Sequence, residues 1–386
     1  MVSKRICLFV GAIAAILFPV SSLYAANTAE IEAVRARTLQ SKATLSPADQ
    51  AILDKFVHDA LEELYFEEDP WRAVDVRETI LAQKGAADPS PYKIAFAEAV
   101  AKHLKTTFEN AARLQNPDHR QRLTLNLIIL AAGLQTTEMV QFGLDRLGDT
   151  HPTTQYWAVK TVTNPGVAAQ LTSQVLGDED LARRIISRLD QVVSDTMAPE
   201  TMRMIVEFAD RLNTAEARAL VNKIADLRTL QYANWTVRYE MLEMPLLTAL
   251  GKQIIAETAD ARRADLLRRF SQLYSYVIER YVLGENLLDE LQKQQLVSVI
   301  AEIENGPITE ILARPQNRLR KALEGGKGSV IDAERQILLG SATQPGQLAG
   351  KFAYDYGKGP GNAALTEPLR LKAPPALTAS PDAAQP

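Results

Sequence analysis

Apolar residues recur along most of the chain at helical spacing. The clearest segment is 261–283, where the apolar positions step by one, three or four residues: Leu266, Leu267, Phe270, Leu273, Tyr274, Val277, Ile278 and Tyr281. This spacing places them on one broad stripe of an α-helix. Segments 51–66 and 287–303 repeat the pattern. Residues 156–163 are rich in residues that favour strands, but no partner strand or hairpin turn is near them, so we interpret them as helix as well. The pattern predicts an all-α fold.

Prolines mark where these helices are expected to begin. Five of them follow a residue that caps helices well, in the pairs Ser46-Pro47, Asp69-Pro70, Ser90-Pro91, Asn116-Pro117 and Asn164-Pro165. Proline suits the first position of a helix because its missing N–H would have no partner there, and the preceding side chain accepts from the next free amides. Weaker caps precede three more prolines, in His151-Pro152, Ala198-Pro199 and Gly306-Pro307.

The distances between these prolines leave room for one helix, or two short ones, and a short connection. Short connections make consecutive helices antiparallel, which predicts successive helix hairpins. Over residues 90–325 this arrangement resembles the α-solenoids of the HEAT and armadillo type, in which hairpins stack into a superhelix. The resemblance is one of architecture, because the repeat period is irregular and no tetratricopeptide signature is present. An irregular multi-helix bundle is the alternative.

The first 25 residues have the pattern of a secretory signal peptide. Lys4 and Arg5 precede an apolar run of about fifteen residues, and small residues follow it. We expect cleavage after Ala25, because cleavage after Ala26 would leave the bulky Tyr24 three residues before the cut. An uncleaved membrane anchor is the alternative, although a membrane span needs roughly 20 apolar residues. The pattern predicts export to a bacterial periplasm or the extracellular space.

Composition and charge narrow the class of protein further. Apolar residues make up 46% of the chain and charged residues 23%, which excludes wholesale disorder. The net charge is −4, and removal of the leader takes away two cations and no acid, which lowers it to −6. Non-specific nucleic-acid binding needs a strongly basic domain, so we expect no nucleic-acid partner. The only cysteine, Cys7, lies in the leader, so the mature chain can form no disulfide and no thiolate metal site.

We divide the mature chain into four regions. Residues 26–89 form an N-terminal helical region, residues 90–325 the helical array, and residues 326–356 a short C-terminal helical segment. Residues 357–386 contain six prolines, three glycines and seven alanines. Such a segment buries too little apolar surface to offset its ordering entropy, so we expect a disordered tail.

Candidate metal-binding residues are few. The four histidines, His58, His103, His119 and His151, form no metal-binding motif, and we predict no metal site. An acidic run contains Asp59, Glu62, Glu63, Glu67, Glu68 and Asp69, which fits no EF-hand loop. We interpret this run as a solvated helix junction with Arg72 and Arg77 as partners. A calcium site or a surface for a basic partner is the alternative.

The glycine-rich segment 325–329 does not match a phosphate-binding loop. Lys321 stands where the first glycine is needed, and Gly328 stands where the hydroxyl is needed. We expect Gly325 or Gly326 to end one helix and Ser329 to cap the next. No cofactor is therefore predicted.

Four arginines flank the apolar stripe of segment 261–283: Arg262, Arg263, Arg268 and Arg269. A helix that lies on a membrane surface or on an anionic partner has this pattern. The same segment carries Asp260, Asp265 and Glu279, which favours a core helix with a charged outer face.

No serine stands in a nucleophile motif and no carboxylate pair is distinguished from the others, so we nominate no catalytic residue. The sequence favours an exported helical-repeat protein that binds a protein partner in the cell envelope, because stacked hairpins offer extended surface without a catalytic pocket. Two alternatives stay open. One is an exported enzyme with its site at helix ends, and the other is a structural protein that lies against a membrane.

Overall fold

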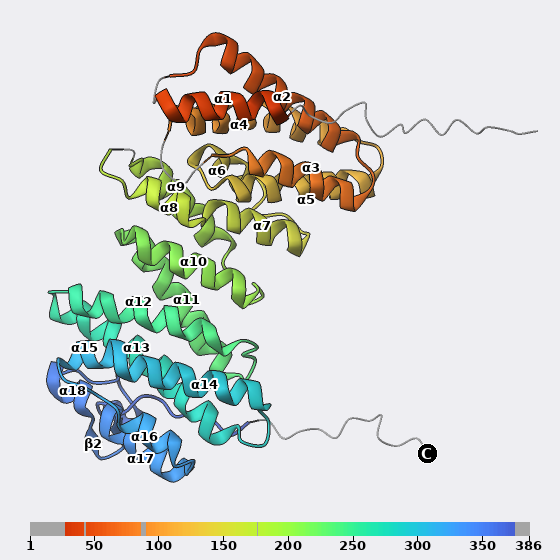
Figure 1. Cartoon of the computed structure of the whole chain (residues 1–386). Helices are drawn as coiled ribbons and strands as arrows, with labels where there is room; N and C mark the ends of the chain where they lie inside the picture. Colours follow the sequence, from red (N-terminus) through yellow and green to blue (C-terminus); the bar gives the residue numbers. More distant parts are fainter. Residues whose placement is uncertain (1–27, 42–43, 86–89, 176, 375–386) are drawn as a thin grey trace, which may run out of the picture. The chain divides into compact units, whose positions relative to one another are not determined.

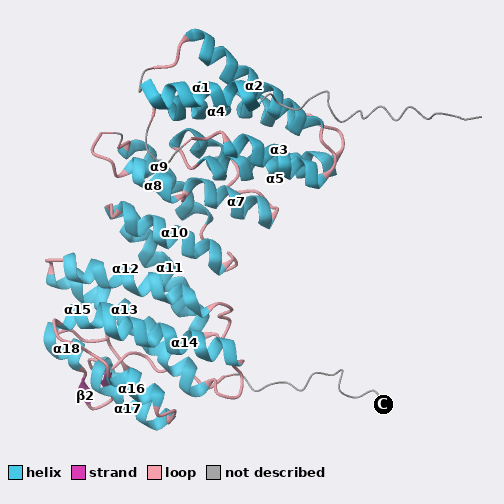
Figure 2. Ribbon diagram, in the orientation of Figure 1, coloured by secondary structure: helices cyan, strands magenta, loops and turns pink. Residues whose placement is uncertain are grey.

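A computed structural model of the chain describes residues 28–41, 44–85, 90–175 and 177–374. Helices contain 74% of these residues. The only strands among them are the two-residue pair β1 (Gly340–Ser341) and β2 (Gln344–Pro345), which are antiparallel (Figure 2). The all-α prediction is therefore confirmed. The expected cleavage after Ala25 or Ala26 lies outside the described residues.

The chain divides into two compact units, residues 1–127 and residues 128–386. The first unit contains α1 (Thr28–Ser41), α2 (Pro47–Phe66), α3 (Pro70–Ala82) and α4 (Pro91–Ala112), and α2 packs against the other three (Figure 1). Its core includes Leu61, Leu64, Phe96 and Leu104. Helix α5 (Pro117–Leu134) begins in this unit and ends in the second.

The second unit is a series of helices in which neighbours in sequence pack as neighbours in space. Contacts join α6 to α7, α10 to α11, α11 to α12, α12 to α13, α13 to α14 and α16 to α17. In chain order its elements are η2 (Thr137–Met139), α6 (Val140–Leu144), α7 (Pro152–Val162), α8 (Pro165–Leu171), α9 (Glu179–Val192), α10 (Pro199–Leu212), α11 (Ala215–Ala233), η3 (Glu240–Leu242), α12 (Glu243–Ala256), α13 (Asp260–Leu283), α14 (Glu290–Ile303), η4 (Glu304–Ile308), α15 (Thr309–Leu312), α16 (Arg318–Glu324), α17 (Gly328–Leu339), β1, β2, α18 (Gln347–Phe352) and η5 (Pro360–Asn362).

Helix α13 is the central element of the second unit. It contacts α11, α12, α14 and α17, and every residue from Leu273 to Arg280 is buried. The predicted apolar stripe is buried except for Tyr281, which is half-buried. The sequence pattern did not predict that polar residues on other sides of the helix, Ser275 and Glu279 among them, are buried as well.

The proline signals predicted most helix starts correctly. Helices α2, α3, α4, α5, α7, α8 and α10 each begin at one of the prolines named above. The expected caps are present: Ser46 accepts from the amide of Asp49, Ser90 from that of Lys93, and Asn164 from that of Gly166. Residues 156–162 lie in α7, as the helical interpretation requires.

Two local predictions are wrong. Pro307 does not begin a helix but lies inside the π-helical turn η4, which joins α14 directly to α15. A wider turn accommodates a ring that lacks an N–H and clashes with the carbonyl of a preceding turn. Ser329 does not cap α17, which begins one residue earlier, at Gly328, without a side-chain cap.

The expected disorder is wrong for residues 357–374. Tyr356 donates to the carbonyl of Leu365, and Leu365 donates to that of Gly357, so this stretch begins with a hairpin-like turn. The following residues are held by side chains of α13 and α17, contacts that composition alone does not reveal. Residues 375–386 lie outside the described part of the chain.

Within the described residues, none of the helices has both the length and the apolar character that a bilayer crossing requires.

Candidate functional site

A cleft of about 900 Å³ opens in the second unit. It is lined by α7, the loop that joins α9 to α10, the first turn of α10, the end of α11 and the loop that follows α11. Tyr156 and Tyr239 contribute aromatic rings, Asp195 and Glu200 contribute carboxylates, and most of the other lining side chains are polar. Leu230 lies at this cleft with 55% of its surface exposed.

One residue that lines the cleft, Arg228, belongs to a buried ion pair. Arg228 lines the cleft although its side chain is only 1% exposed, and its Nε lies 2.6 Å from Oε1 of the fully buried Glu243. Arg228 also donates to Oε1 of Gln231 (2.7 Å) and to the backbone carbonyl of Tyr239 (2.8 Å). Burial raises the pKa of the Glu243 carboxyl, and the charge of Arg228 opposes that rise. These contacts fix the loop 234–239, which is one wall of the cleft.

A second buried pair supports the same loop from α13. Arg280 donates to Oε1 of Glu240 (2.9 Å) and to the backbone carbonyl of Val237 (3.1 Å). Its guanidinium lies 5.5 Å from the centre of the Trp235 ring. Trp235 itself has a positive φ of 59°, a conformation that a bulky residue keeps only where its surroundings hold it there. The loop 234–239 is therefore held by side chains of both α11 and α13.

The cleft offers both polar and apolar groups to a ligand. Its amide, hydroxyl and charged side chains can exchange hydrogen bonds, and the exposed Leu230 and the half-buried Tyr156 offer apolar contact. Protein interfaces combine apolar and aromatic anchors with a polar rim in the same way.

The histidines of the first unit are bound to other groups of the chain. His103 lies 3.0 Å from Oδ1 of Asp54, its ring meets that of His58 edge-on at 5.4 Å, and His119 lies 3.0 Å from the carbonyl oxygen of Tyr65. His151 is the exposed residue before α7. No three histidine, cysteine, aspartate or glutamate side chains converge as a metal site within the part of the chain that the structure describes.

The acidic run lies at the junction of α2 and α3. Asp69 caps α3 by accepting from the amide of Trp71, and Glu67 pairs with Arg72 at 3.4 Å. Arg77 instead donates to Oδ1 of Asn126 at 2.7 Å. These contacts agree with the interpretation of the run as a helix junction, with Arg72 as its partner.

The arginines of α13 contact other groups of the second unit. Arg268 donates to the backbone carbonyl of Asp355 (2.7 Å), and Arg269 pairs with Asp226 at 2.6 Å. Arg263 donates to the carbonyl of Glu257. Because three of the four guanidiniums are bound within the chain, the helix matches the core interpretation.

The glycine-rich segment connects α16 to α17, and Gly326 has a positive φ of 67° in that turn.

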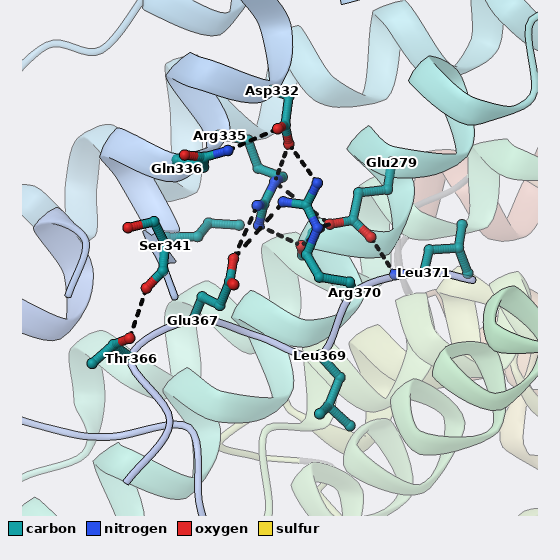
Figure 3. A network of polar contacts seen from close by, with 12 residues as sticks. Glu279, Asp332, Arg335, Gln336, Ser341, Thr366, Glu367, Leu369, Arg370 and Leu371 are labelled. Carbon is teal, nitrogen blue, oxygen red and sulfur yellow. Dashed lines mark hydrogen bonds and ion pairs between the residues drawn. The ribbon is translucent and has the colours of Figure 1, made fainter. Parts of the chain in front are cut away.

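A cluster of five charged side chains joins α13 and α17 to the C-terminal residues (Figure 3). The buried Arg335 of α17 contacts Asp332 (2.9 Å), Glu367 (3.2 Å) and, more distantly, Glu279 of α13 (3.5 Å). Arg370 contacts Glu279 (3.1 Å) and Asp332 (2.9 Å). Three carboxylates thus face two guanidiniums, and within this cluster Arg335 and Glu279 are buried while Arg370 is partly exposed.

The cluster holds one carboxylate more than it has guanidiniums, and the pKa values of two of its carboxyl groups are raised. Burial raises the pKa of Glu279 to about 7, and the negative charge of Asp332 adds to the rise. The amide of Leu371 and the charge of Arg370 oppose it. Burial and the charge of Asp332 raise the pKa of Glu367 in the same direction.

The sequence pattern predicts neither the two buried ion pairs at the cleft nor the cluster of five charged side chains. Charged residues are usually solvated, and Glu240, Glu243 and Glu279 have no special spacing from the arginines that they meet. One signal was available in α13, because Ser271, Ser275 and Glu279 follow one another at intervals of four. Such spacing is a second, polar stripe beside the apolar stripe of the helix.

We compared the chain with models of known protein families, with curated proteins and with solved structures, and none of them matches it. The fold and the cleft define its class: an all-α protein with a preorganised polar cleft.

Proposed function

We propose that this protein is an interaction module of the cell envelope, which binds a protein partner through the cleft between α7, α10 and α11. The observation that supports this proposal most strongly is the buried Arg228–Glu243 pair, which holds one side of a polar cleft that also contains the exposed Leu230. A wall held before binding loses little conformational entropy when the partner arrives.

The arrangement of helices supports the same proposal. In the second unit, helices adjacent in sequence pack together, as in the HEAT and armadillo arrays that the sequence resembles. Such arrays present extended surfaces to their partners. Export through the leader of residues 1–25 is part of the proposal and rests on the sequence pattern alone.

Site-specific photo-crosslinking in cells tests the proposal. A photoreactive residue is introduced at Leu230 or Tyr156 in the cleft, and at Val330 or Ile337 of α17 as controls, which are 44% and 41% exposed. We expect one reproducible partner of the envelope to crosslink at the cleft positions and not at the controls. Crosslinking at α17 with none at the cleft would overturn the assignment.

A second experiment measures the affinity for the partner after a charge has been introduced at the cleft. We expect Leu230→Glu to weaken partner binding at least tenfold, because it places a charge where apolar contact is proposed. Leu291→Glu on α14 is the matched control, because Leu291 is 63% exposed and lies outside the cleft. Equal affinity of the two variants for the captured partner would contradict the proposal.

A further inference from the structure

Residues 366–372, here named the strap, lie across α13 and α17 and are held there by side chains (Figure 3). Gln272 of α13 binds both backbone groups of Leu369: its Nε2 donates to the carbonyl (2.9 Å), and its Oε1 accepts from the amide (2.8 Å). Two residues further on, the amide of Leu371 donates to Oε2 of Glu279. Side chains of one helix thus bind alternate backbone groups of an extended segment, which is how proteins recognise linear peptides.

The strap's own side chains enter matching positions. Glu367 meets the buried Arg335, Arg370 meets Glu279 and Asp332, and Leu371 is buried with 6% of its surface exposed. We call the surface of α13 and α17 that the strap covers, with Gln272, Glu279, Asp332 and Arg335, the groove. It pairs with an acidic residue of the strap, then with a basic residue three positions later, and an apolar residue follows. The acidic residue meets Arg335, and the basic residue meets Glu279 and Asp332.

The strap is attached in a way that permits it to leave. Leu369 is 59% exposed and the Arg370 side chain 44% exposed, whereas Pro368 and Leu371 are buried. Before the strap lie Gly357 and Gly361, with φ values of +99° and +71°, and a Cβ at either would meet nothing within 4 Å. Glycine changes backbone conformation at low cost, so this stretch can act as a hinge.

We propose that the groove of α13 and α17 is a docking site for an extended segment, and that the strap of a second copy of this chain can occupy it in place of the chain's own strap. Every copy carries both the groove and the segment that fits it, so the contacts in the exchanged pair are the same as those within one chain. Exchange of identical elements is a low-cost route to dimers. The tethered strap has the advantage of a high effective concentration, so the exchanged form requires concentrated chains or a weakened contact within the chain.

Complementation between two full-length variants tests the exchange. Glu367→Arg disables the strap of one chain and leaves its groove intact, and Arg335→Gln weakens the groove of the other and leaves its strap intact. Alone, each variant is expected to stay monomeric, since neither carries both halves in working form. Mixed, they are expected to form a one-to-one dimer, in which the intact strap fills the intact groove, measured by analytical ultracentrifugation. A mixture that remains monomeric at high concentration overturns the exchange.

A peptide titration keeps the inference testable if the buried Arg335→Gln variant fails to fold. The full-length double variant Glu367→Ala/Arg370→Ala weakens the strap and keeps every groove residue. A fluorescent peptide with the sequence of residues 366–372 should bind this variant at least tenfold more tightly than it binds the unaltered chain, and a peptide with Glu and Arg interchanged should not. Failure of the peptide to bind the folded double variant overturns the docking site. Binding of the peptide without dimer formation in the mixture overturns the second copy as its occupant.

Discussion

Arg228, Arg280 and Arg335 are guanidiniums buried in the second unit, and each lies against a carboxylate from another element or another turn. Removing two charges from water costs free energy that their mutual attraction only partly returns. Loss of one partner therefore costs far more than loss of both, because the remaining charge keeps its desolvation cost. This asymmetry distinguishes a buried pair from the surface pairs elsewhere in the chain.

The Arg228–Glu243 pair gives the first prediction. Arg228→Ala should lower the free energy of unfolding by about 3–5 kcal/mol, because Glu243 is left buried without its counter-charge. The double variant Arg228→Met/Glu243→Leu should lose less than the single variant. Urea denaturation followed by circular dichroism measures both. A double variant that is less stable than the single one would contradict this account of the pair.

The second prediction concerns pH and Glu279. The charged or titratable groups that face its carboxyl are Tyr276 on α13, Asp332 and Arg335 on α17, and Glu367 and Arg370 of the strap. With a pKa of about 7 in the folded protein, against 4.5 for an ordinary glutamate, Glu279 favours folding most below pH 4.5. That contribution is lost as the pH rises through 7. It is worth on the order of 3 kcal/mol, since a tenfold change in a proton equilibrium is about 1.4 kcal/mol.

The matched variant for this prediction is Glu279→Gln, which keeps an oxygen for the amide of Leu371. Its free energy of unfolding should depend less on pH between 5 and 8 than that of the unaltered chain, as measured by urea titrations at several pH values. Identical pH profiles for the two proteins would exclude Glu279 as the titrating group.

At the scale of elements, a short stretch of sequence predicts where a helix starts only when the start does not depend on neighbouring helices. A capping residue before a proline defines a helix start within four residues of sequence, which is why Ser46, Ser90 and Asn164 were assigned correctly. Pro307 has the same local appearance but continues a helix, because the surrounding helices hold α14 and α15 together through a π turn. A signal that depends on such neighbours cannot be read from a short stretch of sequence.

The contact between α12 and this π turn gives the third prediction. A Cβ at Gly251 of α12 would lie 2.9 Å from Cβ of Pro307, closer than two such atoms approach. Although alanine is the better helix former, Gly251→Ala should lower the free energy of unfolding by about 1–3 kcal/mol through overpacking.

Gly350→Ala on α18 is the control, because a Cβ there meets nothing within 4 Å. It should leave stability unchanged or raise it by up to about 1 kcal/mol. Thermal and urea denaturation of both variants measure the difference. The same effect at the two positions would show that helix propensity, and not the approach to Pro307, decides the outcome.

At the scale of the whole molecule, the sequence predicts the all-α fold class but not the position of the cleft. Periodicity and prolines repeat in every region, so the all-α fold needed no single correct assignment. The cleft draws its walls from residues between Pro152 and Tyr239 that share no motif. The strap was misjudged because its composition suggests disorder, whereas Glu367 and Arg370 are held by partners on helices that lie far away in sequence.

The fourth prediction tests the class directly. Far-ultraviolet circular dichroism of the purified chain should give a helix content well above one half, since 74% of the described residues are helical. A content below one half would contradict the fold and, with it, the helical surface on which the proposed function depends.

The strap also constrains the order in which the second unit folds. Neighbouring helices such as α10 and α11 can pair as soon as both have been synthesised, because only two residues separate them. The bonds of the strap span much longer distances: 97 residues separate Gln272 from Leu369, and 137 separate Trp235 from Lys372. Until residue 372 has emerged, α13 and α17 hold Glu279 and Arg335 without their final partners. The charged cluster can therefore be completed only after the strap has been synthesised.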